Sequence, residues 1–325
     1  MGIHLYLIGN GFDLHHKINS SYGNFRVWMS DTHPDELNHV EEVYGGCDED
    51  WWSDFENQLA SLDAIRFGEE IALENPPDLL SEHCDRTWND AEIEVEQQLE
   101  YLYSDLKTCF HDWIKQLNKP LAEKMVRIKT QDSIFINFNY TKTLEDLYGI
   151  NPGNVLHIHG CIDSDENFII GHGKSDEELR YMNTVNLPDP PDDLPSEEYA
   201  QFYDEVANCG QEFHEQLATE AAINGVASQR KPVAELIKKH TPFFEAIKDV
   251  IYIHVYGLSM SDVDMPYLEY FASKYNSLPW EFNDFKGENN KKIERFCQAN
   301  GIHDYSIIEL ENIQFARQLS INFSE

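Results

Sequence analysis

The sequence predicts an α/β fold in which a mainly parallel sheet is flanked by helices. Short apolar runs of strand type alternate along the chain with longer segments of helical periodicity, a pattern typical of parallel sheets. The 325 residues are 41% hydrophobic and 26% charged, which is close to the averages of globular proteins and enough to bury a full core. This composition excludes collagenous, low-complexity and wholly disordered chains.

Six short apolar runs are the expected strands of the sheet. In chain order they are Ile3–Ile8, Ser133–Asn137, Val155–His159, Phe168–Ile170, Val250–Tyr256 and Tyr305–Glu309. An amphipathic helix, Pro232–Lys248, is expected to lead directly into the fifth of them.

Two insertions are expected to interrupt the sheet. The first, residues 31–128, is helical, because apolar residues in its second half recur at the three-to-four spacing of one helix face. These residues are Val95, Leu99, Leu102, Leu106, Phe110, Trp113 and Leu117. The second, residues 174–230, opens with acidic, proline-broken sequence and is either a solvated surface loop or a lid or partner-docking element. We interpret residues 1–325 as one domain that carries both insertions.

The charge balance excludes one class of partner. The chain has 59 Asp and Glu against 24 Lys and Arg, a formal net charge of −35 at pH 7. Because a protein that neutralises phosphates needs clustered cations, we expect no binding to nucleic acid or to anionic membrane. A nucleotide pocket is compatible with this charge, since backbone N–H groups at a helix N-terminus bind phosphate without side-chain charge.

The sequence favours a cytoplasmic protein. Its first residues, MGIHLYLIGNGFDL, lack the basic start and the small-residue cleavage site of a signal peptide. No apolar run reaches the length of about 18 residues that a membrane span requires. The cysteines are scattered with no C-x-x-C pair, which indicates reduced thiols and not disulfides or a zinc site. They are Cys47, Cys84, Cys109, Cys161, Cys209 and Cys297.

Two candidate ligand-binding segments follow the first two strands, at the carboxyl ends where open α/β sheets bind ligands. Gly9, Asn10 and Gly11 end the first strand, and helical sequence begins at Phe12. Paired glycines at such a turn let the backbone approach a pyrophosphate, although a tight turn without a ligand has the same signature. Asn139 follows the second strand, where it is either a site residue or a helix N-cap.

A third segment contains the histidines of NVLHIHG. His157 and His159 are two residues apart on the expected strand and so share a face, and with His172 they would suit a metal. We expect no metal, because a histidine on a strand is more often structural than a ligand. His159, placed before Gly160 where the strand ends, is better suited to acid/base work.

A fourth segment follows the late strand Val250–Tyr256. The strand ends at Gly257, and Ser259, Asp262 and Asp264 precede the start of the next helix. These polar side chains are expected to face the same crevice as the first glycine turn. The alternative is that they serve only the turn and the helix cap.

In their order along the chain, the four segments resemble the sirtuin superfamily, which has a Rossmann-like fold. The resemblance implies that the Gly9–Gly11 turn grips the pyrophosphate of NAD and that Asn139 contacts the nicotinamide ribose and water. It also implies that His159 is the catalytic base and that Gly257–Ser259 binds the adenosine half. Closer still, GNGFDLHHKINSSYGNF, WWSDFENQLA, FNYTKTLE, HIHG and YGLSMSDVD are similar to the AbiH family of phage abortive-infection proteins, as far as about Phe271.

The chain departs from the protein-deacylating sirtuins. The four-cysteine zinc module is absent, Thr141 stands where an acid is expected, and Asp13 replaces the Ser of the phosphate turn. These differences argue against a deacylase and resemble the sirtuin-like defence effectors that hydrolyse NAD.

The resemblance therefore implies antiviral defence by hydrolysis of NAD, or of a related nucleotide, to nicotinamide and ADP-ribose. Nicotinamide leaves as a neutral group, so the reaction needs a positioned nucleophile and stabilisation of an oxocarbenium-like ribose, but no general acid. His159 is the expected base, Asn139 orients the nucleophile, and Asp13 or Glu56 supplies the stabilising carboxylate. Asp13 is alternatively a helix cap or a ligand of the adenosine ribose, and Glu56 is alternatively on the solvated face of a helix.

Two rival functions stay open, a nucleotide-binding sensor or regulatory module without turnover and a metal-dependent hydrolase built on the three histidines. A toxic effector present before infection requires restraint, so a phage-derived or neighbouring-gene activator is an expected partner. Homo-oligomer formation also stays open.

Overall fold

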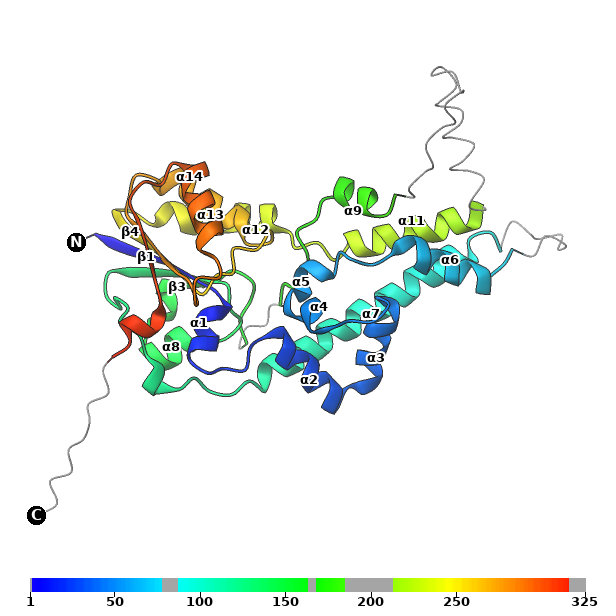
Figure 1. Cartoon of the computed structure of the whole chain (residues 1–325), viewed down its shortest axis with the longest axis horizontal. Helices are drawn as coiled ribbons and strands as arrows, with labels where there is room; N and C mark the ends of the chain where they lie inside the picture. The colour runs from blue at the N-terminus through cyan, green and yellow to red at the C-terminus, as the bar shows by residue number, and fades with distance from the viewer. Residues whose placement is uncertain (1, 78–86, 163–167, 185–212, 316–325) are drawn as a thin grey trace, which may run out of the picture. The chain divides into compact units, whose positions relative to one another are not determined.

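The computed structural model describes residues 2–77, 87–162, 168–184 and 213–315 (Figure 1). The chain divides into two compact units. Unit 1 comprises residues 1–28, 109–170 and 231–325, and unit 2 comprises residues 29–108 and 171–230. The two predicted insertions overlap unit 2, except that residues 109–128 of the first belong to unit 1.

The sheet of unit 1 is all parallel over its six described strands. They are β1 (Ile3–Ile8), β2 (Ser133–Asn137), β3 (Val155–His157), β4 (Val250–Tyr256), β5 (Trp280–Asn283) and β6 (Tyr305–Ile308). Their order across the sheet is β3-β2-β1-β4-β5-β6. This is the doubly wound, Rossmann-like order, in which ligands bind where the winding reverses, here between the carboxyl ends of β1 and β4. The predicted fold class is confirmed.

Helices cover both faces of this sheet, because its central strand is apolar on both sides (Figure 1). Leu5 and Leu7 of β1 lie in a core with α12 (Val233–Ala246), α13 (Met265–Tyr275) and α14 (Asn290–Asn300). The alternate residues Tyr6 and Ile8 lie in a second core with α1 and α8. Those two helices span Asn10–His15 and Thr143–Tyr148.

Unit 2 is helical over its described residues. Its helices are α3 (Pro34–Val43), α4 (Glu49–Ser53), α5 (Phe55–Gln58), α6 (Ala64–Glu74), α9 (Asp176–Met182) and α11 (Phe213–Ala227). Two further helices, α2 (Tyr22–Thr32) and α7 (Asp90–Lys115), contribute residues to both units. Helix α6 approaches α11 closely at Gly68, where an added Cβ would lie 2.7 Å from the backbone nitrogen of Thr219. Only glycine allows this approach.

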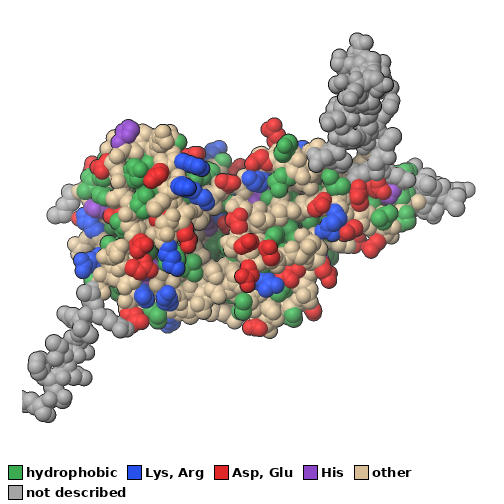
Figure 2. Space-filling model, viewed as in Figure 1, with side chains coloured by type: hydrophobic (Ala, Val, Ile, Leu, Met, Phe, Trp, Pro, Cys, Tyr) green, Lys and Arg blue, Asp and Glu red, His purple; other side chains and the backbone are tan. Residues whose placement is uncertain are grey.

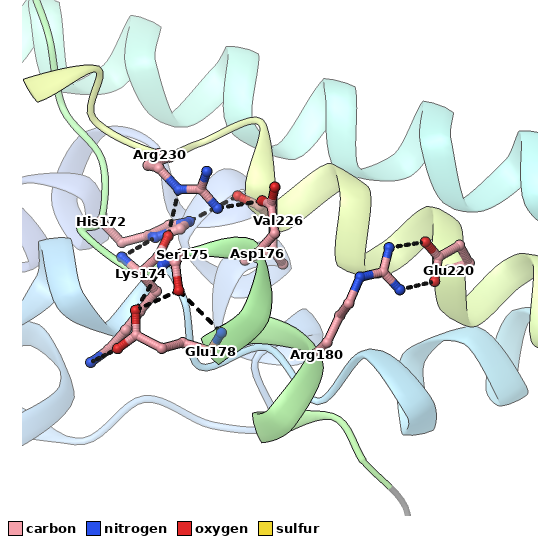
Figure 3. A network of polar contacts seen from close by, with 9 residues as sticks. All are labelled: His172, Lys174, Ser175, Asp176, Glu178, Arg180, Glu220, Val226 and Arg230. Carbon is pink, nitrogen blue, oxygen red and sulfur yellow. Dashed lines mark hydrogen bonds and ion pairs between the residues drawn. The ribbon is translucent and has the colours of Figure 1, made fainter. Parts of the chain in front are cut away.

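Ion pairs join α9 to α11 in unit 2 (Figure 3). Arg180 of α9 donates two hydrogen bonds to the carboxylate of Glu220 on α11, and Arg230 pairs with Asp176 in the first turn of α9. Ser175 caps the N-terminus of α9 through a capping box. Because these side chains are largely exposed, solvent screens the pairs and they contribute little to stability.

Three strand predictions need correction. Phe168–Ile170 is irregular, although the N–H of Ile169 donates to the carbonyl of His159. The third strand ends at His157 because the chain turns over the next two residues, and the last strand ends at Ile308. The short strand β5 was missed, since its apolar residues Trp280 and Phe282 alternate with polar ones. The predicted helices around Leu106 and over Pro232–Lys248 are confirmed as α7 and α12.

The acidic, proline-broken start of the second insertion lies outside the described residues. Within the described residues, no helix combines the length and the apolar character needed to cross a membrane.

Candidate functional site

The turns after β1 and β4 contact each other through their backbones at the switch point. The N–H of Gly9 donates to the carbonyl of Tyr256 and that of Gly11 to the carbonyl of Gly257, both over 2.8 Å. Gly257 has a φ of +74°, and a Cβ on it would lie 2.1 Å from the nitrogen of Phe12. The glycines predicted to admit a pyrophosphate are therefore required, in this structure, for the approach of the two turns.

The short helix after the first turn offers few open donors to an anion. The N–H of Phe12 donates to the carbonyl of Gly9, while the N–H groups of Gly9 and Gly11 are used by the β4 turn. The side chain of Asn10 is bound to Ser20, through both its amide nitrogen and its oxygen. A phosphate could reach these backbone groups only after the turns rearrange.

Asp13 is the centre of a buried polar cluster at the carboxyl edge of the sheet. Its side chain is 1% exposed and accepts hydrogen bonds from the hydroxyls of Thr141, over 2.5 Å, and Thr143, over 2.8 Å. Burial raises the pKa of Asp13 to about 6, although the hydrogen bonds from Thr141, Thr143 and Asn139 oppose the rise. The residue is not the cap of its helix, because the N-cap is Gly9.

Asn139 links the end of β2 to the β1 turn. Its side-chain amide donates to the carbonyl of Gly9 over 3.0 Å, and its backbone N–H donates to the side chain of Asn137. The alternative that Asn139 is a helix N-cap is wrong, because α8 begins at Thr143 with Lys142 as its N-cap. Asn139 is instead fixed between two strand ends, where it can orient a bound group.

His159 lies just after β3, beside the same edge of the sheet. It is 2% exposed, and its ring packs edge-on against Phe138 and Tyr267, with centroids 5.5 and 5.7 Å away. Burial, with the nearby charge of Lys231, lowers the pKa of His159 well below its usual value, so the imidazole is neutral at pH 7. Its Nε2 is buried and has no hydrogen-bond partner among the described residues. This nitrogen can accept a hydrogen bond, but the lowered pKa makes His159 a weak base as long as it stays buried.

The segment after Gly257 carries the remaining predicted polar residues. Ser259 and Asp262 are exposed, and Asp264 is the N-cap residue of α13, although its side chain makes no capping hydrogen bond. The predicted helix start with proline in its first turn is confirmed. Ser259 and Asp262 are therefore accessible to solvent; that they face the same crevice as the first glycine turn stays a prediction.

Glu56 belongs to unit 2, whereas Asp13 and His159 belong to unit 1. It lies on α5, and the apolar side predicted for this helical region is buried, with Trp52, Phe55 and Leu59 at 0 to 2% exposure. Glu56 itself is partly buried, and both readings, a site carboxylate and a residue on the solvated face of the helix, stay open.

The three histidines of the metal hypothesis do not form one cluster. His172 belongs to unit 2, where its Nε2 lies 2.9 Å from the carbonyl of Val226. The described residues contain no group of three or more His, Cys, Asp or Glu side chains arranged to hold a metal ion. Thr143 and Glu145, by contrast, were not singled out from sequence; Thr143 binds Asp13, and Glu145 binds His157.

The comparisons with known proteins support one family. A model of the family described as "Bacteriophage abortive infection AbiH" matches residues 5–284, which include all four predicted segments. Neither the comparison with curated proteins nor that with solved structures gave a match. The chain therefore belongs to the AbiH family of bacteriophage abortive-infection proteins.

Proposed function

We propose that this chain carries out its defence role by hydrolysing NAD to nicotinamide and ADP-ribose at the carboxyl edge of the sheet of unit 1. Membership of the AbiH family implies phage abortive-infection defence. The observation that carries the chemistry is the buried group at the switch point, in which Asp13, Asn139 and the β1 turn are bonded together. His159, whose Nε2 has no partner among the described residues, follows the neighbouring strand β3.

The electrostatics of this group suit cleavage of a glycosidic bond to a cationic ring. With a pKa of about 6, Asp13 is mostly ionised at pH 7, and a buried carboxylate stabilises an oxocarbenium-like ribose more than an exposed one does. His159 accepts the proton of the water or ribose hydroxyl that acts as nucleophile once opening of the site relieves the burial that lowers its pKa. The Asn139 amide, fixed by the carbonyl of Gly9, orients that nucleophile.

The same structure supports the need for an activator. His159 is almost fully buried, and the backbone donors of the β1 turn are occupied. We therefore propose a resting state that a phage-derived or neighbouring-gene product opens. On the face shown in Figure 2, the Lys and Arg side chains lie among acidic ones and form no continuous stripe. This distribution favours NAD or a related nucleotide over nucleic acid as the ligand. The proposed compartment is the cytoplasm, where NAD is available.

The test is nicotinamide release from NAD by the purified protein, alone and with extract of infected cells. We expect release by the wild type with extract, and a loss of about 100-fold or more in His159→Ala and Asn139→Ala. His303→Ala and Asn312→Ala are matched controls, because both residues are exposed, and they should keep full activity. Equal activity in all variants would contradict the assigned roles.

A nucleotide-binding sensor without turnover is the second candidate, and the closed turns favour it. Because the donors of Gly9, Gly11 and Phe12 are already bonded, ligand binding requires a rearrangement that is itself a signal. If NAD raises the thermal midpoint of the protein while no nicotinamide forms, with or without extract, the sensor replaces the hydrolase.

A further inference from the structure

Asn139 is held through its backbone as well as its side chain, and one of these bonds comes from a residue that the proposed mechanism does not use. Its side-chain amide donates to Gly9 and its backbone N–H donates to Asn137. Its backbone carbonyl lies 3.3 Å from Nδ1 of His157, the last residue of β3. The side-chain oxygen of Asn139 has no hydrogen-bond partner among the described residues, so it is the atom that can accept from a bound water or hydroxyl.

His157 is fixed from its other side by Glu145. Its Nε2 lies 2.8 Å from Oε1 of Glu145, which projects from α8. The two side chains are 13% and 8% exposed, so solvent screens this contact little. The other oxygen of Glu145 is buried without a hydrogen-bond partner among the described residues. A carboxylate, an imidazole and a backbone carbonyl thus form one chain from α8 through β3 to Asn139.

The protonation of His157 decides which neighbour its Nδ1 can bind. A protonated Nδ1 donates to the carbonyl of Asn139. A deprotonated Nδ1 is an acceptor instead, and the side-chain nitrogen of Asn137 lies 3.4 Å from it. Burial alone would lower the pKa of His157, but Cys161 and Glu145 raise it to about 10, so the ring is doubly protonated at pH 7. The bond to Asn139 is therefore the one made in this state.

Glu145 is the neighbour through which the charge of His157 is best changed. The titratable groups that act on the ring are Glu145 from α8, Cys161 from the turn after β3 and Asp13 from α1. Among them, Glu145 accepts a hydrogen bond from the ring over 2.8 Å. Its replacement by glutamine removes a charge and keeps an oxygen that can accept the same bond.

We propose that His157 is a positioning residue for Asn139: held by Glu145, it donates from Nδ1 to the Asn139 carbonyl and fixes the direction of the free side-chain oxygen. The catalytic part of this role rests on the proposed cleavage of NAD, whereas the orientation of Asn139 does not. Loss of the bond lets the Asn139 peptide rotate and misplaces that oxygen. An error of about 1 Å in such a group costs on the order of 100-fold in rate.

The experiment compares two variants with a matched control. Glu145→Gln removes the charge beside His157, and His157→Gln removes the imidazole. Glu281→Gln is the control, because Glu281 pairs with His254 in the same sheet over 3.0 Å and makes no hydrogen bond to Asn139. Thermal unfolding is recorded for each protein, so that a variant that fails to fold is recognised.

Nuclear magnetic resonance of isotope-labelled protein is the measurement that needs no activity. The ring nitrogens of His157 are identified by their loss in His157→Gln, and the side-chain amide of Asn139 by its loss in Asn139→Ala. We expect a doubly protonated ring in the wild type from about pH 6 to 9, below its pKa of about 10. In Glu145→Gln the ring should lose its second proton at a pH lower by at least about 1, and the Asn139 amide signal should shift with the same midpoint.

Nicotinamide release, measured with extract as above, tests the catalytic part. At pH 8.5 we expect kcat to fall by about tenfold or more in His157→Gln and Glu145→Gln, with KM changed by less than about twofold. The rate of Glu145→Gln relative to the wild type should rise as the pH falls to 6.5, because the imidazole of the variant is protonated again. Glu281→Gln should keep the kcat, the KM and the pH profile of the wild type.

Two results would overturn the positioning role. One is a wild-type His157 ring that is singly protonated at pH 7. The other is an Asn139 amide signal that stays in place while His157 loses its proton in folded Glu145→Gln. If His157→Gln fails to fold, Glu145→Gln decides, and an unchanged kcat beside a shifted Asn139 signal would overturn the catalytic part. If the wild type releases no nicotinamide with or without extract, the proposed hydrolysis fails, and the resonance measurements still decide the orientation of Asn139.

Discussion

Asp13 carries a buried carboxylate, and its ionisation opposes folding. Its folded pKa of about 6 exceeds 3.8, the ordinary value of an aspartate side chain. The protonated form therefore stabilises the fold below pH 3.8, and this stabilisation is lost as the pH rises through 6. We expect wild-type protein to lose roughly 2 kcal/mol more of its free energy of unfolding between pH 4 and pH 7 than Asp13→Asn does. Urea unfolding at the two pH values measures this difference.

The same substitution separates stability from activity. Asp13→Asn keeps a neutral group that can still bond to Thr141 and Thr143, so the fold should persist, while the proposed NAD cleavage is lost. In the wild type that activity should rise with pH around a midpoint near 6 as the carboxylate ionises. If the wild type and Asp13→Asn lose the same free energy of unfolding between the two pH values, the Asp13 carboxyl group is not buried as described.

The sequence identified Asp13 as a candidate, but not its partners. Thr141 lies 128 residues away along the chain, and no local pattern predicts which hydroxyls a carboxylate will meet after folding. The aromatic burial of His159 was likewise beyond prediction, since Tyr267 comes from α13. What the sequence did predict was that these residues follow strand ends, because parallel strands end at one edge of a sheet.

At the scale of elements, the contact between the β1 and β4 turns makes Gly257 the glycine of the site where an added side chain is tolerated least. Gly257→Ala places a Cβ 2.1 Å from the nitrogen of Phe12 at a φ of +74°, and should destabilise the protein by more than about 3 kcal/mol. Gly149→Ala is the matched control, because Gly149 has a φ of +64° with nothing within 4 Å. It should cost only about 1 kcal/mol, the strain of a positive φ.

Chemical denaturation of the two variants separates backbone strain from steric overlap. If Gly257→Ala is no less stable than Gly149→Ala, the turns are not packed against each other as described. The comparison is independent of the ligand and of any activator.

Strands with continuous apolar runs were predictable, and those without them were not. β1, β2 and β4 were predicted at the residues where they occur, because each is a mostly apolar run with buried residues on both faces. β5 has polar residues at every second position, and a pattern of only four residues is too short to predict a strand. Phe168–Ile170 has the composition of a strand, but Phe168 is used to pack against Phe110 and Tyr140 in a loop.

At the scale of the whole molecule, the net charge of −35 predicts a stability that depends on salt. Mutual repulsion of the carboxylates opposes the compact state, and added ions screen it. We expect the thermal midpoint to rise by about 2–5 °C between 0.05 and 0.5 M sodium chloride. Ion pairs such as Arg180–Glu220 are weakened by the same salt, but exposed pairs contribute too little to reverse the sign.

Differential scanning calorimetry across the salt series measures this shift. A neutral osmolyte at matched osmolality is the control for effects unrelated to charge. A thermal midpoint that falls with salt would mean that attractive pairs dominate over the excess of carboxylates.

The backbone bonds between the β1 and β4 turns also determine when, during synthesis, the candidate site can form. The N–H groups of Gly9 and Gly11 find their acceptors at Tyr256 and Gly257, and at about 5–20 residues per second a ribosome needs on the order of ten to fifty seconds to reach that point. Until then β1 lacks β4, one of its two neighbouring strands. The chain segment between β1 and β4 is long, so the two strands pair late. A nascent or prematurely terminated chain that lacks Gly257 therefore cannot form this contact, and the candidate site stays incomplete in such a copy.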